Sequence, residues 1–275
     1  MKYFELKKEF EILFFDAKIE ETADIDWIMV EITGRKRSML PFFEITDEEY
    51  EKILNAINLR LKHIPIGYIF GKSDFYGRDF FVTNDTLIPR IDTEILIETV
   101  IEMIKNQEKK CSVLDIGTGT GAIAITIQKE TNSDVTAVDI SEKALSIAQK
   151  NAENLDSKVK FIKSNLFENV KNQKFDFIVS SPPYIKSSVI ETLDPEVRLN
   201  EPILALDGGE SGLDFYEKII SQAKNYLNLN GYLCFEIGYD QAIEVSKLME
   251  RDFEDIKVIK DYSDNDRVVY GRLRG

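Results

Sequence analysis

The sequence predicts an α/β protein in which a mostly parallel, doubly wound sheet is preceded by a small helical bundle. From about residue 88 onward, short apolar strand-like runs alternate with helical segments, the pattern of a parallel sheet covered by helices. Before about residue 70, the apolar residues recur at helical spacing instead. A glycine-rich turn directly follows the first strand of the alternating region. Together these observations predict two domains of unequal size.

The composition favours a cytoplasmic protein. The 275 residues are 43% hydrophobic, enough to bury a substantial core. The first residues lack the basic region and apolar run of a signal peptide, and no stretch approaches the ~18 uncharged apolar residues of a membrane span. Cys111 and Cys234 both lie in apolar runs, so we expect buried, reduced thiols and no metal site.

The net charge of −14 restricts the partners that we expect. Neither the part of the chain up to Asp85 nor the remainder has an excess of lysine and arginine over aspartate and glutamate. Proteins that grip long duplex nucleic acid normally present a basic face, because neutralising phosphates supplies much of the affinity. A local basic patch would still be compatible with an acidic total. We expect no stable nucleic-acid partner.

Residues 1–70 are expected to form the helical bundle. Asp24 to Ile32 is a predicted helix, and Thr46 with Glu49 has the pattern of a capping box at the start of another. Trp27 is interpreted as part of the bundle core. Apolar residues at helical spacing support the first and third helices: Phe10, Leu13, Phe14 and Ala17, then Tyr50, Ile53, Leu54, Ile57 and Leu61.

Residues 71–87 are expected to link the two domains. Gly67, Gly71 and Gly77 punctuate an aromatic stretch from Tyr68 to Val82 that resembles strands. This pattern predicts a hairpin.

Residues 88–275 contain the alternating pattern and its strands. Ligands in doubly wound sheets bind beyond the carboxyl ends of the strands, at the point where the strand order reverses. Motifs that end a strand are therefore the candidates for chemistry. The seven strand candidates are Ser112–Ile116, Val135–Asp139, Val159–Ile162, Phe175–Ser180, Tyr232–Ile237, Ile256–Ile259 and Val268–Leu273.

The turn after the first of these strands predicts a nucleotide-type cofactor. Its glycines allow a tight turn and a close approach of ligand to backbone, and Asp139 ends the next strand, where a carboxylate can accept both ribose hydroxyls of an adenosine. The glycines alone also fit a dinucleotide site. Asp115 favours S-adenosylmethionine, because a carboxylate would repel pyrophosphate but suits the cationic methionine end. The turn reads Gly117-Thr118-Gly119-Thr120-Gly121.

The fourth strand runs into Ser181-Pro182-Pro183-Tyr184. Prolines cannot donate backbone hydrogen bonds and fix the local φ angles, so their carbonyls stay available as rigid acceptors. A planar –NH2 group could donate to the Pro182 carbonyl and the Ser181 hydroxyl while Tyr184 stacks on its π face. The nitrogen lone pair would then point at a methyl donor. The alternative interpretation is an ordinary turn after a strand.

The sequence resembles the PrmC/HemK family, the glutamine-N5 methyltransferases of peptide-chain release factors. The likeness covers nearly the whole region after the bundle, and the order and spacing of its short segments make it specific. These segments are Gly67-Tyr68-Ile69-Phe70-Gly71, Phe75-Tyr76-Gly77, Ile88-Pro89-Arg90-Ile91-Asp92-Thr93-Glu94, Asp115 through Ala122, Ser181 through Tyr184, Glu196-Val197-Arg198, Glu201-Pro202, Ala205-Leu206, Gly208-Gly209, Gly212-Leu213 and Asp266-Arg267-Val268-Val269.

The resemblance implies a Rossmann-like, seven-stranded methyltransferase domain and a helical domain that helps dock the substrate. The substrate would be the glutamine of the Gly-Gly-Gln motif in class I release factors. The methyl donor would be S-adenosyl-L-methionine, which is converted to S-adenosyl-L-homocysteine. Residues 117–121 and Asp115, Asp139 and Ser181 would contact the cofactor, with Asn165 and Leu166 near its adenine. Residues 181–184 would hold the glutamine amide. We expect a monomer with a transient partner.

Departures from the family pattern leave alternatives open. Ser181 stands where the family usually has Asn, and serine is typical of cytosine-N4 methyltransferases, so methylation of adenine-N6 or cytosine-N4 in nucleic acid is the second hypothesis. A third is a non-catalytic module that binds nucleotide. Asn165 replaces a common Asp. Arg90 either binds a carboxylate or pairs with Asp92 or Glu94, and His63 is expected to be a helix-end or packing residue.

Overall fold

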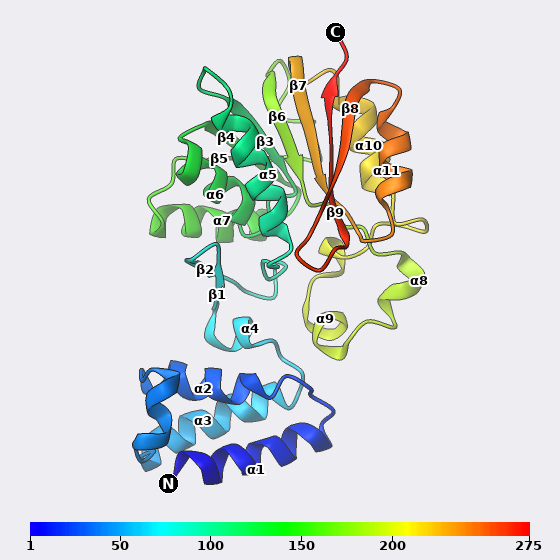
Figure 1. Cartoon of the computed structure of the whole chain (residues 1–275). Helices are drawn as coiled ribbons and strands as arrows, with labels where there is room; N and C mark the ends of the chain where they lie inside the picture. Colours follow the sequence, from blue (N-terminus) through cyan, green and yellow to red (C-terminus); the bar gives the residue numbers. More distant parts are fainter. The chain divides into compact units, whose positions relative to one another are not determined.

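The computed structural model describes all 275 residues and divides into two compact units. The first unit holds Met1–Gly71 together with the segment Asp194–Asn200, and the second holds Lys72–Leu193 and Glu201–Gly275. The chain therefore leaves the second unit after Leu193 and returns to it at Glu201. Figure 1 labels the elements. None of the helices has both the length and the apolar character needed to cross a membrane.

The first unit is a helical bundle, as predicted. Phe10 and Phe14 from its first helix pack against Ile25 and Ile28 from its second in a buried cluster. The capping box is present, because the Thr46 hydroxyl accepts from the Glu49 N–H at 3.2 Å. The elements are α1 (Tyr3–Asp16), α2 (Ala23–Thr33), the 3-10 helix η1 (Arg37–Phe42), α3 (Asp47–Arg60), α4 (Ile66–Phe70) and α9 (Pro195–Asn200).

Trp27 does not belong to the core of this unit, contrary to the prediction. Its side chain is 49% exposed. Helix α2 buries Ile25, Ile28 and Met29, which recur at spacings of three and four residues, so Trp27 lies on the opposite face. The same helix buries Asp26, which accepts hydrogen bonds from Tyr3, Lys7 and Arg37.

Arg60 joins α9 to the rest of the first unit. It is 2% exposed, and its guanidinium donates to Asp24 at 2.7 Å and to Glu196 at 2.6 Å. His63 follows the end of α3 in a left-handed conformation, with φ of 61°, and its carbonyl accepts from Asn200 at 2.9 Å. These contacts hold the segment Asp194–Asn200 against the other helices of the first unit.

The stretch that resembled strands begins as a helix. Helix α4 ends at Gly71, whose φ of 68° is the left-handed conformation of a helix terminus. The predicted hairpin follows, with β1 (Lys72–Phe75) antiparallel to β2 (Arg78–Phe81). Phe75 and Phe80 are buried in the core of the second unit. The hairpin that the sequence analysis assigned to a linker therefore packs with the catalytic region.

The second unit is built on a seven-stranded sheet in the order β5-β4-β3-β6-β7-β9-β8. The first five of these strands are parallel, and β9 is antiparallel to both of its neighbours. The mostly parallel sheet is thus confirmed. The strands are β3 (Ser112–Ile116), β4 (Asp134–Asp139), β5 (Lys160–Lys163), β6 (Phe175–Ser180), β7 (Leu227–Glu236), β8 (Phe253–Lys260) and β9 (Asp266–Leu273).

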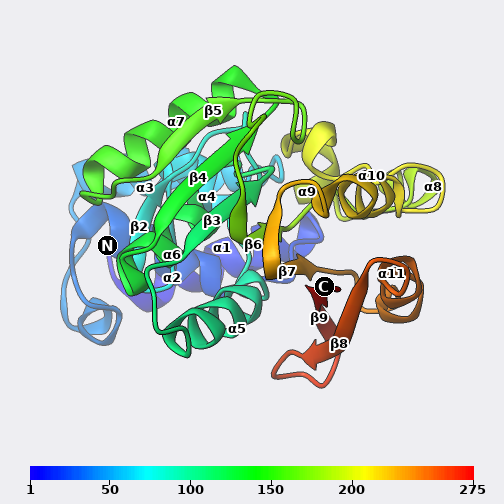
Figure 2. The ribbon, with the colours of Figure 1, turned by 90° about the horizontal axis from the view of Figure 1, so that it is seen from above.

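Helices cover both faces of this sheet (Figure 2). Each face has its own buried apolar cluster, and both cysteines are buried and free, as expected. On one face lie α5 (Thr93–Lys105), α6 (Ala122–Thr131) and α7 (Glu142–Asn154), and on the other lie α10 (Asp214–Ala223) and α11 (Ala242–Met249), while the short α8 (Ser187–Ile190) and η2 (Ile203–Ala205) lie in the connection from β6 to α10.

The strand order reverses at β3. The chain proceeds from β3 through β4 to β5, then returns to place β6 on the other side of β3. Ile116, the last residue of β3, is in register with Ser180, the last residue of β6. The glycine-rich turn and the Ser181-Pro182-Pro183 segment therefore emerge side by side at the edge where ligands bind in such sheets.

Candidate active site

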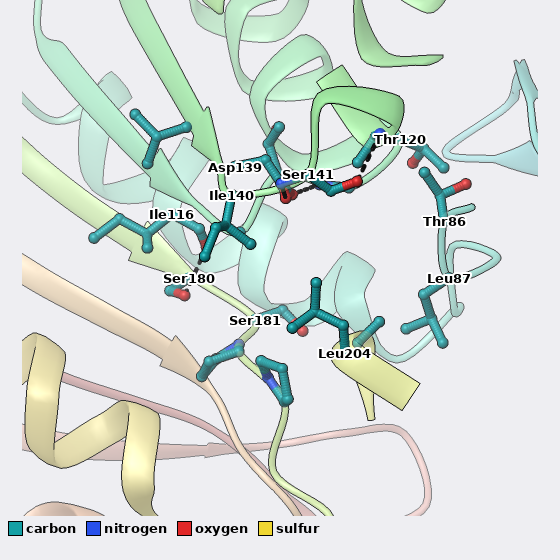
Figure 3. Close-up of a pocket in the computed structure, with 18 of the residues that line it drawn as sticks. Thr86, Leu87, Ile116, Thr120, Asp139, Ile140, Ser141, Ser180, Ser181 and Leu204 are labelled. Carbon is teal, nitrogen blue, oxygen red and sulfur yellow. Dashed lines mark hydrogen bonds between the residues drawn. The ribbon is translucent and has the colours of Figure 1, made fainter. Parts of the chain in front are cut away.

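A cavity of about 520 Å³ opens beyond the carboxyl ends of β3, β4 and β6. Figure 3 shows Asp139 and Ser181 at its wall, with Thr86 and Leu87 across the cavity from Ile116 and Ile140. Thr86 and Leu87 lie in the loop between β2 and α5, which the sequence analysis did not assign to the site. All of the lining residues belong to the second unit.

The glycine-rich turn leaves room for a ligand. Gly117 and Gly119 have φ of 76° and 55°, and a Cβ on either would meet no atom within 4 Å. The N–H groups of Gly117 and Thr118 donate to the Val138 carbonyl at 2.9 and 3.0 Å, which fixes the turn against β4. Both glycines, Thr118 and Thr120 line the cavity. The turn thus presents backbone to the cavity where side chains would obstruct it.

Gly121 does not line the cavity, although we expected it to contact the cofactor. Its φ is 81°, and a Cβ would lie 2.9 Å from the side chain of Ile125 and 3.2 Å from that of Ala148. The absence of a side chain lets the start of α6 pack closely against α7. The structure gives this glycine a packing role, and direct cofactor contact stays a prediction.

Asp139 faces the cavity with its carboxylate already oriented. One oxygen accepts from the Gly119 N–H and the other from the Ser141 N–H, each at 2.9 Å. Burial raises the pKa of Asp139, and these backbone hydrogen bonds oppose the shift. A carboxylate offers about four acceptor positions, so two remain for hydroxyl groups of a ligand.

Asp115 lies behind the turn rather than in the cavity wall. It is completely buried, and it accepts a hydrogen bond from the Thr118 hydroxyl at 2.6 Å. Thr118 itself lines the cavity. The pKa of Asp115 is raised to about 7. Burial is the main cause, and the negative charge of the nearby Asp139 raises it further. This geometry suits a role in orienting Thr118, and direct contact of Asp115 with the cofactor stays a prediction.

Asn165 and Leu166 follow β5 and line the same cavity. Leu166 has a φ of 48°, a strained conformation for a non-glycine residue, and its carbonyl accepts from the Ser164 hydroxyl at 2.8 Å. From the end of β4, Ile140 also reaches the cavity and is 49% exposed. The sequence analysis missed Ile140. It could have been found as the apolar residue that directly follows Asp139, the carboxylate that ends β4.

The Ser181-Pro182-Pro183 segment forms the neighbouring wall. Ser180 ends β6 and donates to the Ile116 carbonyl at 2.8 Å, and the next three residues line the cavity. Tyr184 is not part of the wall. Its ring packs against the buried cluster that contains Phe235, and its hydroxyl lies 3.5 Å from the Glu236 carboxylate. Burial raises the pKa of Tyr184 strongly. Stacking of Tyr184 on a substrate amide stays a prediction.

The segment 206–212 holds the backbone of this motif. A Cβ on Gly208 would lie 2.7 Å from the Cα of Tyr184, so only glycine fits there. The Ile185 N–H donates to the Leu206 carbonyl at 3.0 Å, and the Gln241 side chain donates to the Tyr184 carbonyl at 3.0 Å. These contacts explain why glycines recur in the segment after the motif.

Glu236 lies beneath the motif at the end of β7 and was missed by the sequence analysis. It is buried, its carboxylate accepts from the Thr93 hydroxyl at 2.7 Å, and the Ser181 hydroxyl is near enough to lower its pKa. Burial raises the pKa of Glu236, while these hydroxyls and the charge of Arg267 oppose the shift. In sequence, a single glutamate at the end of an apolar strand gave no sign of this role.

Arg90 pairs with neither of its expected partners. It donates to the buried Glu201 at 2.6 Å and lines the cavity. Asp92 instead pairs with Arg267 at 3.1 Å, and Glu94 accepts from the Tyr76 N–H at 2.8 Å. The short sequence spacing suggested that Arg90 would pair with Asp92 or Glu94, but the fold places the distant Glu201 beside it.

The chain is similar to known methyltransferases. Residues 90–194 match the family model of the methyltransferase small domain. The release factor glutamine methyltransferase of Clostridium botulinum is 44% identical over 238 residues, which cover 84% of this chain and 84% of the relative. That of Fusobacterium nucleatum is 42% identical over 257 residues, covering 90% and 72%, and that of Francisella tularensis is 38% identical over 267 residues, covering 94% and 93%.

The chain belongs to the release factor glutamine methyltransferase family. The protein is therefore a methyltransferase. Among solved structures, a methyltransferase from Pyrococcus furiosus aligns with a TM-score of 0.57 at 23% identity, covering 73% of this chain and 91% of that one. A 16S rRNA methyltransferase of Thermus thermophilus aligns with a TM-score of 0.52 at 18% identity, covering 74% and 50%. These likenesses confirm the fold.

Proposed function

We propose that the protein methylates the side-chain amide nitrogen of the glutamine in the Gly-Gly-Gln motif of class I peptide-chain release factors. The observation that carries the proposal is a single cavity lined by both the glycine-rich turn and the Ser181-Pro182-Pro183 segment. A methyl donor and a planar amide can therefore meet at adjacent strand ends. The names of relatives that share 38–44% of its residues supply the identity of the substrate.

The residues of the cavity fit S-adenosylmethionine. When bound, the cofactor supplies an electrophilic methyl group on a sulfonium and leaves as S-adenosyl-L-homocysteine. Asp139 would accept from the ribose hydroxyls, with Ile140 and Leu166 beside the adenine. Thr118, oriented by the buried Asp115, would contact the methionine end. The open space over Gly117 and Gly119 allows the backbone to approach the ligand.

The Ser181 hydroxyl and the Pro182 carbonyl are suited to hold the glutamine amide. An amide nitrogen is a weak nucleophile because its lone pair is delocalised into the carbonyl. Two hydrogen bonds from its –NH2 group fix the nitrogen in place, and they strengthen as positive charge develops during methyl transfer. The proton can leave after the new bond forms, so the site needs no strong base.

The alternative of nucleic-acid methylation has less support. A duplex base would have to be flipped out to reach the cavity, and proteins that do so usually track the phosphates with a basic surface. The net charge of −14 argues against such a surface, and the close relatives carry the release-factor name. We infer a cytoplasmic monomer that meets its protein substrate transiently, with the first unit as the docking surface.

Incubation with tritiated S-adenosylmethionine tests the proposal. Parallel reactions contain a class I release factor, the same factor with the motif glutamine replaced by alanine, duplex DNA, or rRNA. We expect label only in the intact release factor, and mass spectrometry should place the methyl group on the Gly-Gly-Gln peptide. Label in DNA or rRNA, with an unlabelled release factor, would overturn the proposal.

A further inference from the structure

Three hydroxyl groups surround a carboxylate beneath the catalytic motif. Glu236 accepts from the Thr93 hydroxyl at 2.7 Å, and its other oxygen lies 3.5 Å from the Tyr184 hydroxyl. The Ser181 hydroxyl is near enough to the same carboxylate to lower its pKa. Glu236 does not line the cavity, whereas Thr93 and Ser181 do. The carboxylate can thus influence a bound substrate through these hydroxyls without touching it.

Packing alone does not account for a glutamate at this position. Glu236 is 3% exposed, and its neighbours Phe235 and Ile237 belong to an apolar cluster. Burying a carboxylate costs several kcal/mol unless hydrogen bonds compensate, and an apolar side chain of similar size would avoid that cost. The burial of this carboxylate therefore depends on the hydroxyl groups that surround it.

The number of protons determines the direction of these hydrogen bonds. A carboxylate has no proton to donate, whereas a serine hydroxyl has one proton and two lone pairs. When Ser181 donates its proton to Glu236, only lone pairs remain to face the cavity. We propose that Glu236 is a positioning residue that fixes the Ser181 hydroxyl as a hydrogen-bond acceptor for the substrate amide.

This direction matters because the reaction uses the lone pair of the amide nitrogen. A hydroxyl that pointed its proton into the cavity could donate to that nitrogen and occupy the lone pair that must attack. A hydroxyl that only accepts instead takes an N–H from the amide. An asparagine at position 181 would meet the same requirement, because its –NH2 could donate to Glu236 and leave its carbonyl for the substrate.

The inference rests on the proposed function, and Glu236→Gln tests it. The amide of glutamine can donate to Ser181 and release the hydroxyl proton toward the cavity. We expect the single-turnover rate of release-factor methylation to fall roughly 10- to 100-fold, with KM for the release factor and affinity for S-adenosylmethionine changed less than about twofold.

Asp176→Asn provides the matched control. Asp176 is also a buried carboxylate that accepts from a serine hydroxyl, Ser112 at 3.0 Å, but it lies at the opposite ends of the strands. We expect its methylation rate to match the wild-type rate. A similar loss of methylation rate in both variants would show that removing the charge of any buried carboxylate slows the enzyme, and it would overturn the inference.

A double-mutant cycle identifies the route of action. If Glu236 acts through Ser181, the combination of Glu236→Gln with Ser181→Ala should be no slower than the slower single variant. Fully multiplicative losses would overturn the inference. If Glu236→Gln does not fold, Glu236→Asp, which withdraws the carboxylate by one methylene, should show the same non-additivity. A wild-type enzyme that leaves the release factor unlabelled would instead refute the proposed function itself.

Discussion

Ser181 provides a hydroxyl at the position where the family pattern usually provides an amide. It lines the cavity between Ser180, which is fixed to β3, and Pro182. Replacing Ser181 with alanine should lower the single-turnover rate roughly 10- to 1000-fold, about 1.4–4 kcal/mol, because the lost hydrogen bond strengthens in the transition state. Cofactor affinity should not change, and Ser181→Asn should retain much of the activity. Wild-type rates in Ser181→Ala would leave the Pro182 carbonyl as the sole acceptor.

Asp115 should make the stability of the cofactor-free protein depend on pH. Burial raises the pKa of Asp115 in the folded protein to about 7, above the ~3.9 of an unfolded aspartate. Folding therefore favours the protonated form, so the contribution of this group is present below the unfolded pKa and is lost as pH rises through about 7. Relative to Asp115→Asn, the wild type should lose free energy of unfolding between about pH 4 and pH 7 in denaturant titrations. Parallel curves for the two proteins would contradict the shifted pKa.

At the scale of elements, alanine substitutions of two glycines in the same turn should impair different properties of the protein. Gly121→Ala adds a Cβ 2.9 Å from Ile125 at a φ of 81°, so it should lower the free energy of unfolding by about 1–3 kcal/mol through backbone strain and displacement of α6. Gly119→Ala is the matched control, because its Cβ meets no protein atom but projects where a ligand would lie. It should impair cofactor binding more than stability. Calorimetry and thermal unfolding of both variants separate the two effects, and equal behaviour would contradict the division.

The elements that the sequence revealed are those whose signals are local. The capping box at Thr46, the turn after β3 and the motif after β6 each lie within a few residues. The capping box forms as predicted, and the turn and the motif directly follow the strands that were predicted to precede them. Glu236 and Thr93 could not be found in this way, because they meet the motif only through strand pairing and α5 packing. Helix α4 was misread because a short aromatic run between glycines fits a strand or a helical turn equally well.

At the scale of the molecule, the sequence predicts the division of the chain into two units only in part. The change from helical spacing to alternating strands marks the boundary near Gly71. The return of Asp194–Asn200 to the first unit depends on the Arg60–Glu196 pair, whose members lie 136 residues apart. Charged residues on short helices carry no pattern that shows which distant partner they have. The chain therefore passes between the two units at residues 71–72, 193–194 and 200–201.

Deletion of residues 1–71 tests whether the first unit docks the substrate. The second unit keeps its two apolar clusters and every residue that lines the cavity, so the shortened protein should still bind S-adenosylmethionine. Methylation of intact release factor should fall, because contacts away from the reacting amide no longer orient the substrate.

A free Gly-Gly-Gln peptide is the control for this deletion. It lacks the docking contacts, so the full-length and shortened enzymes should both use it poorly and at similar rates. A loss confined to the intact release factor would then identify docking as the cause, since damage to the active site would slow both substrates. If the two enzymes methylate folded release factor equally well, the first unit does not dock it, and α9 would hold the helical bundle for a reason unrelated to substrate binding.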